Sequence, residues 1–336
     1  MTLENILFYG VLGLYFGAMI LYFLFVAAKK EGLGKAAVGV QVVGLVLHTA
    51  AIVLRGVIAG RLPLTNQYEF ATAFAWGLCL VSLIFILKFK FTILGAFAAP
   101  ITFLIIGYAA LQSKEIRALM PALQSNWLGF HVSTAIIAYG AFGVSCVLGV
   151  IFLLRDRMKQ SGFLDQHIPS REKLDMLSYR SVSLGLLFLT FTIITGAIWA
   201  ERAWGSYWSW DPKETWSLVT WLVYATYLHL RIRRGWQGKA AAIFAVAGFV
   251  CVIFTYIGVN TLLPGVHSYN AFFCRFFSLG AKLSAACGRY SEAKHGQNNE
   301  KTNAVQISTM FCPWKKRKKR RKKEKLRKKK ETMRIT

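Results

Sequence analysis

The 336-residue sequence has few acidic residues: Asp and Glu number 15, against 41 Lys and Arg. Only 17% of its residues are charged and 55% are hydrophobic, which is too apolar for an ordinary soluble domain. The six cysteines include no CxxC pair, which disfavours thiol–disulfide exchange and covalent cofactor attachment to this chain. A signal-peptide pattern is also lacking, so we expect the first apolar segment to be a true membrane span.

The apolar residues occur in long blocks. A helix needs about 20 residues to cross roughly 30 Å of hydrocarbon. The sequence therefore predicts an all-α, polytopic membrane helix bundle of about eight transmembrane helices, near residues 6–28, 37–58, 68–87, 91–111, 129–153, 181–200, 213–230 and 240–260. A short surface helix is expected within the loop 154–180.

Basic residues gather in alternate loops. Loops 29–36, 88–90, 154–180 and 231–239 carry 3, 2, 6 and 4 Lys and Arg residues, against 6 on the opposite loops and span ends. The positive-inside rule places the richer set in the cytoplasm, so the N-terminus and the end of the eighth span face outward.

Most of the excess charge lies in the last part of the chain. We therefore divide the sequence into a membrane domain, 1–270, and an atypical, basic tail, 271–336, which we expect to be disordered. The run KKRKKRRKKEKLRKKK at 315–330 repels itself and could bind anionic lipid or nucleic acid. We assign the tail no function and expect membrane lipid, but no specific nucleic acid, among the partners.

Two polar segments precede spans on the outer side. Asn66 and Glu69, in GRLPLTNQYEF, form a capping pattern for the third span, which alone would explain both residues, although a functional role is the alternative. Asp211, Pro212 and Glu214 form an N-cap, a first-turn proline and a capping-box carboxylate for the seventh span.

The second of these segments is rich in tryptophan. Residues 199–221 hold six of the ten tryptophans, Trp199, Trp204, Trp208, Trp210, Trp216 and Trp221. They could belong to an interfacial aromatic belt, but a belt would spread over many helix ends. Their concentration in one outer loop indicates an apolar shelf for a flat ring with a polar edge, and porphyrin is the obvious candidate.

Two histidines are expected near this shelf in depth. His131 lies at the outer entrance of the fifth span and His267 follows the eighth. Together they could ligate haem iron axially and leave no open site for oxygen. His229 lies 18 residues after Asp211, or roughly 27 Å along a helix, so it would need a second, inner site. His48 lies nearer mid-membrane and either serves a haem path or forms a hydrogen bond within the bundle.

The segment WGSYWSWDPKETW resembles the tryptophan-rich WWD signature of haem-handling proteins. Together with LxxHV at 128–132, LHLR at 228–231 and LLPGVHSY at 262–269, it makes residues 1–270 similar to the CcsA/ResC family of System II cytochrome c biogenesis. CcmC and CcmF proteins of System I share the WWD signature, so that signature alone does not separate the families.

This resemblance implies a component of a cytochrome c haem lyase (synthase) complex in the bacterial plasma membrane. Haem b, as ligand and as substrate in transit, would be presented at the outer face to the CxxCH motif of apocytochrome c. The implied partner is a CcsB/ResB-type membrane protein. The implied metal ligands are His131, His267 and His229, and the implied haem cradle is Trp204, Trp208, Trp210 and Asp211.

Two other functions remain open from the residues alone. A multi-spanning transporter of an amphipathic solute, without haem, would explain eight spans and a Trp-rich loop, but it predicts broken half-helices near the midplane. A structural membrane subunit would use the tryptophans only as an anchor.

Truncation after Asn270 tests the division of the chain. We expect the shortened protein to support cytochrome c assembly, because the charges and motifs of the membrane domain all precede this point. The measurement is haem staining of cytochromes c in cells that carry the truncated gene. Loss of staining at a normal level of the truncated protein would contradict the prediction.

Overall fold

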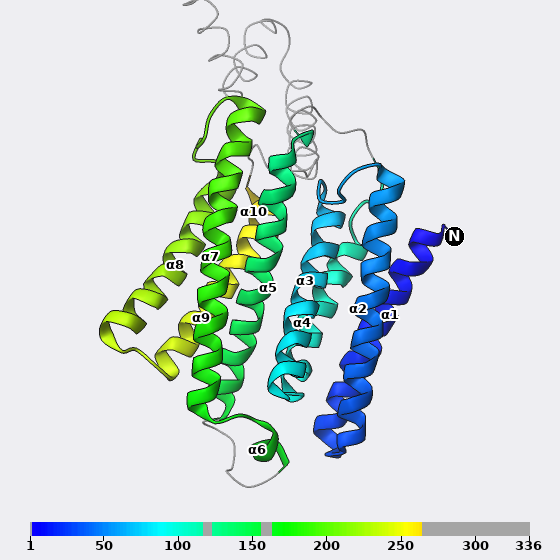
Figure 1. The fold of residues 1–336 in the computed structure, drawn as a ribbon, viewed down its shortest axis with the longest axis vertical. Helices are drawn as coiled ribbons and strands as arrows, with labels where there is room; N and C mark the ends of the chain where they lie inside the picture. Colours follow the sequence, from blue (N-terminus) through cyan, green and yellow to red (C-terminus); the bar gives the residue numbers. More distant parts are fainter. Residues whose placement is uncertain (1, 117–122, 156–162, 264–336) are drawn as a thin grey trace, which may run out of the picture. The chain divides into compact units, whose positions relative to one another are not determined.

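The computed structural model describes residues 2–116, 123–155 and 163–263, and within these ranges every regular element is a helix (Figure 1). The elements are α1 (Leu3–Ala28), α2 (Glu31–Ala59), α3 (Gln67–Phe89), α4 (Ile93–Ala110), α5 (Asn126–Arg155), α6 (Phe163–His167), α7 (Arg171–Trp204), α8 (Pro212–Arg234), α9 (Lys239–Ile253), the π-helix η2 (Phe254–Gly258) and α10 (Val259–Leu262). The predicted fold class, an all-α bundle of about eight long helices, is confirmed. The boundary predicted at residue 270 lies outside the described ranges and stays a prediction.

The helices agree with the predicted spans, and all except α4 extend further than predicted at one or both ends. Helix α7 begins at Arg171 because the Ser170 hydroxyl caps it, accepting from the backbone N–H of Lys173 at 3.3 Å. The predicted eighth span corresponds to α9, η2 and α10, which continue into one another. Helix α6 is the short helix expected in the loop 154–180.

Seven of the eight predicted spans are long and apolar enough to cross a membrane, and α8 is the exception. Its 23 residues suffice in length, but Thr, Tyr, Trp and basic residues lower its hydropathy. Only a narrow stripe of α8 is buried, through Thr220, Tyr224 and Tyr227. The ring of Tyr224 stacks on that of Phe142 in α5, with centroids 3.7 Å apart. Figure 1 shows the C-terminal end of α8 leaning away from the bundle.

Helix α5 is the central element of the bundle. It packs along α3, α7 and α9, and 83% of the residues in its apolar 18-residue stretch are buried within the protein. Helices α1 to α4 form a second group, in which α1 contacts α2 and α4, and α3 contacts α4 (Figure 1). In α1 only 28% of the corresponding 18-residue stretch is buried, so the side of this helix that faces away from the bundle is left to lipid or to a partner protein.

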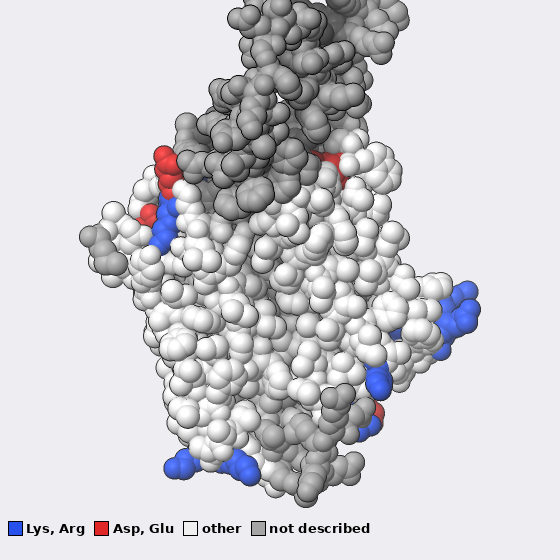
Figure 2. All heavy atoms as spheres, turned by 180° about the vertical axis from the view of Figure 1, so that it is seen from behind, with Lys and Arg blue, Asp and Glu red and all other residues white. Residues whose placement is uncertain are grey.

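Charged side chains are concentrated towards the ends of the bundle. On the face shown in Figure 2, the middle is largely uncharged, whereas Lys and Arg gather near the lower edge and on a projection at the right. That projection is the end of α8, whose last turn carries Arg231, Arg233 and Arg234. An uncharged band between charged ends is the surface expected of a membrane protein.

Close packing of α4 on α1 leads to a stability prediction. A Cβ atom on Gly95 would lie 2.2 Å from the ring of Tyr22. This ring is fully buried and its hydroxyl donates to Gln41 Oε1 at 2.6 Å, so it has little room to retreat. We expect Gly95→Ala to cost about 1–3 kcal/mol and to lower the midpoint of thermal unfolding in detergent.

Gly107→Ala is the matched control, because Gly107 lies on the same helix and nothing approaches its Cβ position within 4 Å. Removing a helical glycine there should be neutral or stabilising by roughly 0.5–1 kcal/mol. Equal midpoints for the two variants would contradict the packing argument.

Candidate haem-binding site

A cavity in the described part of the chain lies where α5 begins and α7 ends. The space not filled by atoms at this place is about 1040 Å³, and this figure includes space that is open to solvent. Five segments supply its walls: the loop before α3 with the first turn of α3, the first half of α5, the second half of α7 with the following loop, the start of α8, and the irregular end of α9. Most of the lining is apolar or aromatic.

His131 contributes the candidate metal-binding group. Its Nδ1 lies 2.8 Å from the backbone carbonyl of Thr192 in α7. A carbonyl oxygen only accepts, so Nδ1 carries the proton and the lone pair of the neutral ring is on Nε2. Metal-ligating histidines characteristically donate their second N–H to such a carbonyl. Trp199 stacks beside the imidazole, with ring centroids 6.1 Å apart and planes at 21°.

A glycine allows this arrangement. A Cβ atom on Gly196 would lie 2.7 Å from His131 Nδ1. Any side chain at this position would therefore push the imidazole away from α7, so that the contact with the Thr192 carbonyl would be lost.

The loop between α7 and α8 is held by Glu214. Its Oε2 accepts from the backbone N–H groups of Ser209, at 2.8 Å, and Asp211, at 3.1 Å. The predicted capping box of Asp211 and Glu214 is present. Because both N–H groups that flank Trp210 point to one carboxylate, Trp210 adopts a left-handed conformation, with φ of 58°. This is a strained position for a bulky residue.

The residues of the predicted haem cradle do not all face the cavity. Trp208 lines the cavity, and its buried Nε1 has no hydrogen-bond partner among the described residues. Trp204 packs edge-on behind Trp199, with centroids 4.9 Å apart. Trp210 points outward and is 69% exposed, while Asp211 is buried as the N-cap of α8. Of the four predicted cradle residues, only Trp208 is in the cavity wall.

The opposite wall was not among the predicted site residues. It is formed by Leu64, Thr65, Asn66 and Gln67. The side chain of Gln67 accepts from the Tyr108 hydroxyl at 2.9 Å, and its carbonyl accepts from the Tyr256 hydroxyl at 3.2 Å. The sequence signal was the polar segment LTNQ, which a capping pattern explained equally well. Asn66 is indeed the N-cap of α3, accepting from Glu69 N–H at 2.8 Å.

The end of α9 completes the cavity. The π-helix η2 places Thr255 and Tyr256 in the wall, and Asn260 follows one turn later. Single turns of π-helix occur often at functional sites, because the extra residue redirects side chains. The sequence showed no sign of this irregularity.

The other histidines lie apart from this cavity or outside the described residues. His267 lies outside the described residues. His229 is exposed on α8. His48 is buried, and its Nδ1 is 3.0 Å from the Tyr15 hydroxyl, so the hydrogen bond expected as one alternative is present.

Haem fits this set of residues better than a bare metal ion does. No group of three or more His, Cys, Asp or Glu side chains in the described ranges could hold an ion. A porphyrin supplies four nitrogen ligands itself and needs only axial ligands from the protein. One oriented imidazole, a stacked indole and an indole N–H in one apolar cavity match that need.

Comparison with known proteins then identifies the family. The model for cytochrome c assembly proteins matches residues 64–267, a range that includes every wall of the cavity. The chain belongs to the CcsA family. The CcsA protein of Prochlorococcus marinus (strain NATL2A) is 42% identical, over 67% of this chain and 82% of that protein. The CcsA protein of Chlamydomonas reinhardtii is 40% identical, over 74% of this chain and 71% of that protein.

A solved structure shares the fold. The cytochrome c haem lyase CcmF is 16% identical and superposes with a TM-score of 0.60, covering 76% of this chain and 47% of that chain. At this identity the likeness concerns the fold alone. The helical bundle of this chain therefore has a counterpart in a solved structure.

The Glu214 contacts lead to a prediction about the loop. We expect Glu214→Ala to accelerate backbone amide exchange across 205–211, because two N–H groups lose their acceptor, at a cost of about 0.5–2 kcal/mol. Hydrogen–deuterium exchange with mass spectrometry would measure this. Glu214→Gln keeps a side-chain oxygen and should remain close to the parent protein. Equal protection in the parent and both variants would show that the carboxylate does not hold the loop.

Proposed function

We propose that this chain is the haem-delivery component of a System II cytochrome c synthase complex, presenting haem for attachment to the CxxCH segment of an apocytochrome c. The observation that carries the proposal is the hydrogen bond between His131 Nδ1 and the Thr192 carbonyl. This bond orients the imidazole in the wall of a largely aromatic and apolar cavity. Membership of a family of cytochrome c assembly proteins supports it.

In this proposal His131 and His267 are the two axial ligands of the haem. The structure describes only His131, so the pairing rests on the family resemblance. Bis-imidazole ligation would leave no open position for oxygen and would tune the reduction potential of the iron. One imidazole must leave during transfer, because the histidine of CxxCH takes its place.

The aromatic wall supplies binding and orientation. Trp199 lies beside the His131 imidazole, and Trp208 offers an indole N–H to a polar edge of the bound ring. Trp204 supports Trp199 from behind, and Asp211 fixes the start of α8. Trp210, which faces away, is available to the incoming apocytochrome.

Haem b, as the substrate, brings two vinyl groups to the reaction. Each cysteine thiol adds across one vinyl double bond, so that a carbon–sulfur bond forms and the thiol proton passes to the other vinyl carbon. No group leaves. The contribution of this chain is to hold the vinyl edges still and near the thiols, which makes a bimolecular reaction effectively unimolecular.

His229 would serve a second, inner haem. It lies about 27 Å along α8 from the cap at Asp211 and is exposed on a helix that leans away from the bundle. An exposed imidazole there can reach a ligand shared with another protein. We assign this pairing to a histidine of a CcsB/ResB-type partner.

The positive-inside count supports an orientation in which the cavity faces the extracytoplasmic side of a bacterial plasma membrane. The basic end of α8 and the basic loops 29–36 and 88–90 would then meet the anionic cytoplasmic leaflet.

Absorbance spectra test the ligands. We expect the full-length protein, purified with its partner from haem-replete cells, to show a Soret band and sharp reduced α/β bands. His131→Ala and His267→Ala should each remove most of the outer-site intensity, because five-coordinate haem is held more weakly, and added imidazole should restore part of it. His167→Ala, on the short helix α6, is a matched control that should keep the full spectrum.

Three outcomes would count against the proposal. Full-strength bands in the His131→Ala, His267→Ala double variant would remove both residues as ligands. Identical spectral loss in His229→Ala and His131→Ala would contradict two separate sites. A colourless, folded preparation would favour the transporter without haem.

A further inference from the structure

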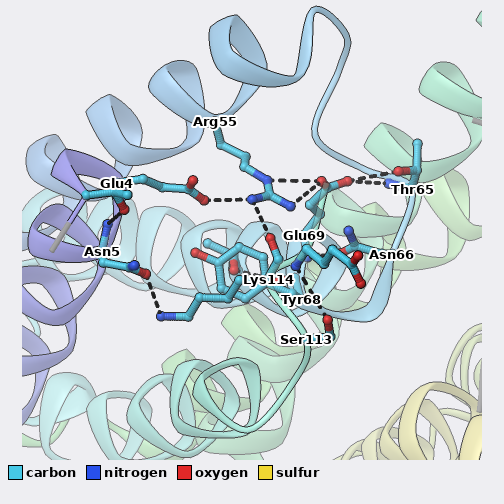
Figure 3. A network of polar contacts seen from close by, with 12 residues as sticks. Glu4, Asn5, Arg55, Thr65, Asn66, Tyr68, Glu69, Ser113 and Lys114 are labelled. Carbon is cyan, nitrogen blue, oxygen red and sulfur yellow. Dashed lines mark hydrogen bonds and ion pairs between the residues drawn. The ribbon is translucent and has the colours of Figure 1, made fainter. Parts of the chain in front are cut away.

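A chain of ion pairs lies at the end of the bundle that holds the cavity, and Figure 3 shows three of its members, Glu4, Arg55 and Glu69. Arg55 of α2 contacts Glu4 of α1 at 2.8 Å and Glu69 of α3 at 3.1 Å. Arg61, in the loop after α2, contacts Glu69 at 3.0 Å. The order of contacts is therefore Glu4, Arg55, Glu69, Arg61, with alternating charge.

Glu69 is the centre of this chain. Its side chain is completely buried, with 0% exposed. Besides the two arginines, its Oε2 accepts from the backbone N–H of Thr65 at 2.9 Å and from the Thr65 hydroxyl at 3.0 Å. Burying ions is costly, and removing one partner of a buried ion pair is strongly destabilising. The contacts of Glu69 therefore strongly determine the path of the loop 61–66.

This loop is also a wall of the cavity. Leu64, Thr65 and Asn66 line the space that contains His131 and Trp208. Leu64 and Thr65 line a second, neighbouring cavity as well, together with Gln124 and Phe130. The loop 61–66 thus lies between the two cavities, and its position limits the cavity that contains His131.

The two ends of the charged chain have different structural tasks. Glu4 joins α1 to Arg55 and touches no cavity-lining residue in the contacts described here. Arg61 contacts Glu69 through two nitrogens, at 3.0 and 3.5 Å, and also donates to the Leu62 carbonyl at 3.3 Å. Of the two ends, only Arg61 contacts Glu69, which in turn accepts from Thr65 in the cavity wall.

We propose that Glu69 and Arg61 are positioning residues of the haem site, which fix the loop 61–66 as the wall facing His131. The proposal rests on the proposed function, in that haem is the ligand of this cavity. A network that merely held α1, α2 and α3 together would have no reason to tie Thr65 through both its N–H and its hydroxyl.

A matched pair of variants, Arg61→Gln and Glu4→Gln, separates the two roles. The side chains of Arg61 and Glu4 are each 14% exposed, and each variant removes one charge from an end of the same chain. Both should lower the unfolding midpoint by a similar amount. Only Arg61→Gln should raise amide exchange in the segment 61–66, by about tenfold, as expected for losing a hydrogen bond to a charged group.

The second readout is haem retention by the full-length protein with its partner. We expect the His131-dependent bands of Arg61→Gln to decay about tenfold faster in the presence of a haem-scavenging apoprotein. The factor is the same as for amide exchange, because the same hydrogen bond to a charged group is lost. Glu4→Gln should match the parent protein. Arg61→Lys keeps the charge but not the paired contacts, and it should recover part of the retention.

The outcomes distinguish failure of this proposal from failure of the proposed function. Equal haem loss in Arg61→Gln and Glu4→Gln would show a network that acts only on stability. Faster exchange in 61–66 with normal haem retention would show a loop that does not support the site. Both results overturn the positioning role alone, whereas absence of any His131-dependent band in the parent protein overturns the proposed function itself.

Discussion

Burial of α5 is the constraint on which the bundle depends. This helix packs against α3, α7 and α9 at once, so its sequence must serve three interfaces while crossing the membrane. Its N-terminal part carries His131, which is held against α7 by the Thr192 carbonyl and admitted there by Gly196. Because the helix is fixed along its length, the imidazole at its end has little freedom, as a preorganised ligand requires.

The two loops that wall the cavity are held by the same device. In each, a carboxylate from the first turn of the following helix accepts backbone N–H groups of the loop: Glu69 accepts from Thr65, and Glu214 accepts from Ser209 and Asp211. An N-cap side chain precedes each carboxylate by three residues, Asn66 and Asp211. Helix starts thus shape the loops that a ligand would meet, and the loops contribute aromatic and polar groups.

The distribution of roles follows from depth in the membrane. Near the end of the bundle that holds the cavity, polar side chains and loop backbone form hydrogen bonds with one another, so irregular backbone is tolerated there. Deeper, the interior is filled by close contacts such as Gly95 against Tyr22 and the Phe142–Tyr224 stack. The exposed His229 and the basic end of α8 belong to neither region, which suits a surface shared with another protein or lipid.

The sequence by itself determined the membrane-spanning helices, because long apolar runs leave the backbone no alternative to internal hydrogen bonding in lipid. It also identified both caps and His131, the one histidine among the described residues that lines the cavity, since these depend on local spacing. Only the tertiary structure decided which tryptophans face the cavity and that the loop 61–66 opposes them. Periodicity does not encode the left-handed turn at Trp210, the π-helix η2 or the row of ion pairs that runs from Glu4 through Arg55 and Glu69 to Arg61. These features arise from contacts between residues far apart in the chain.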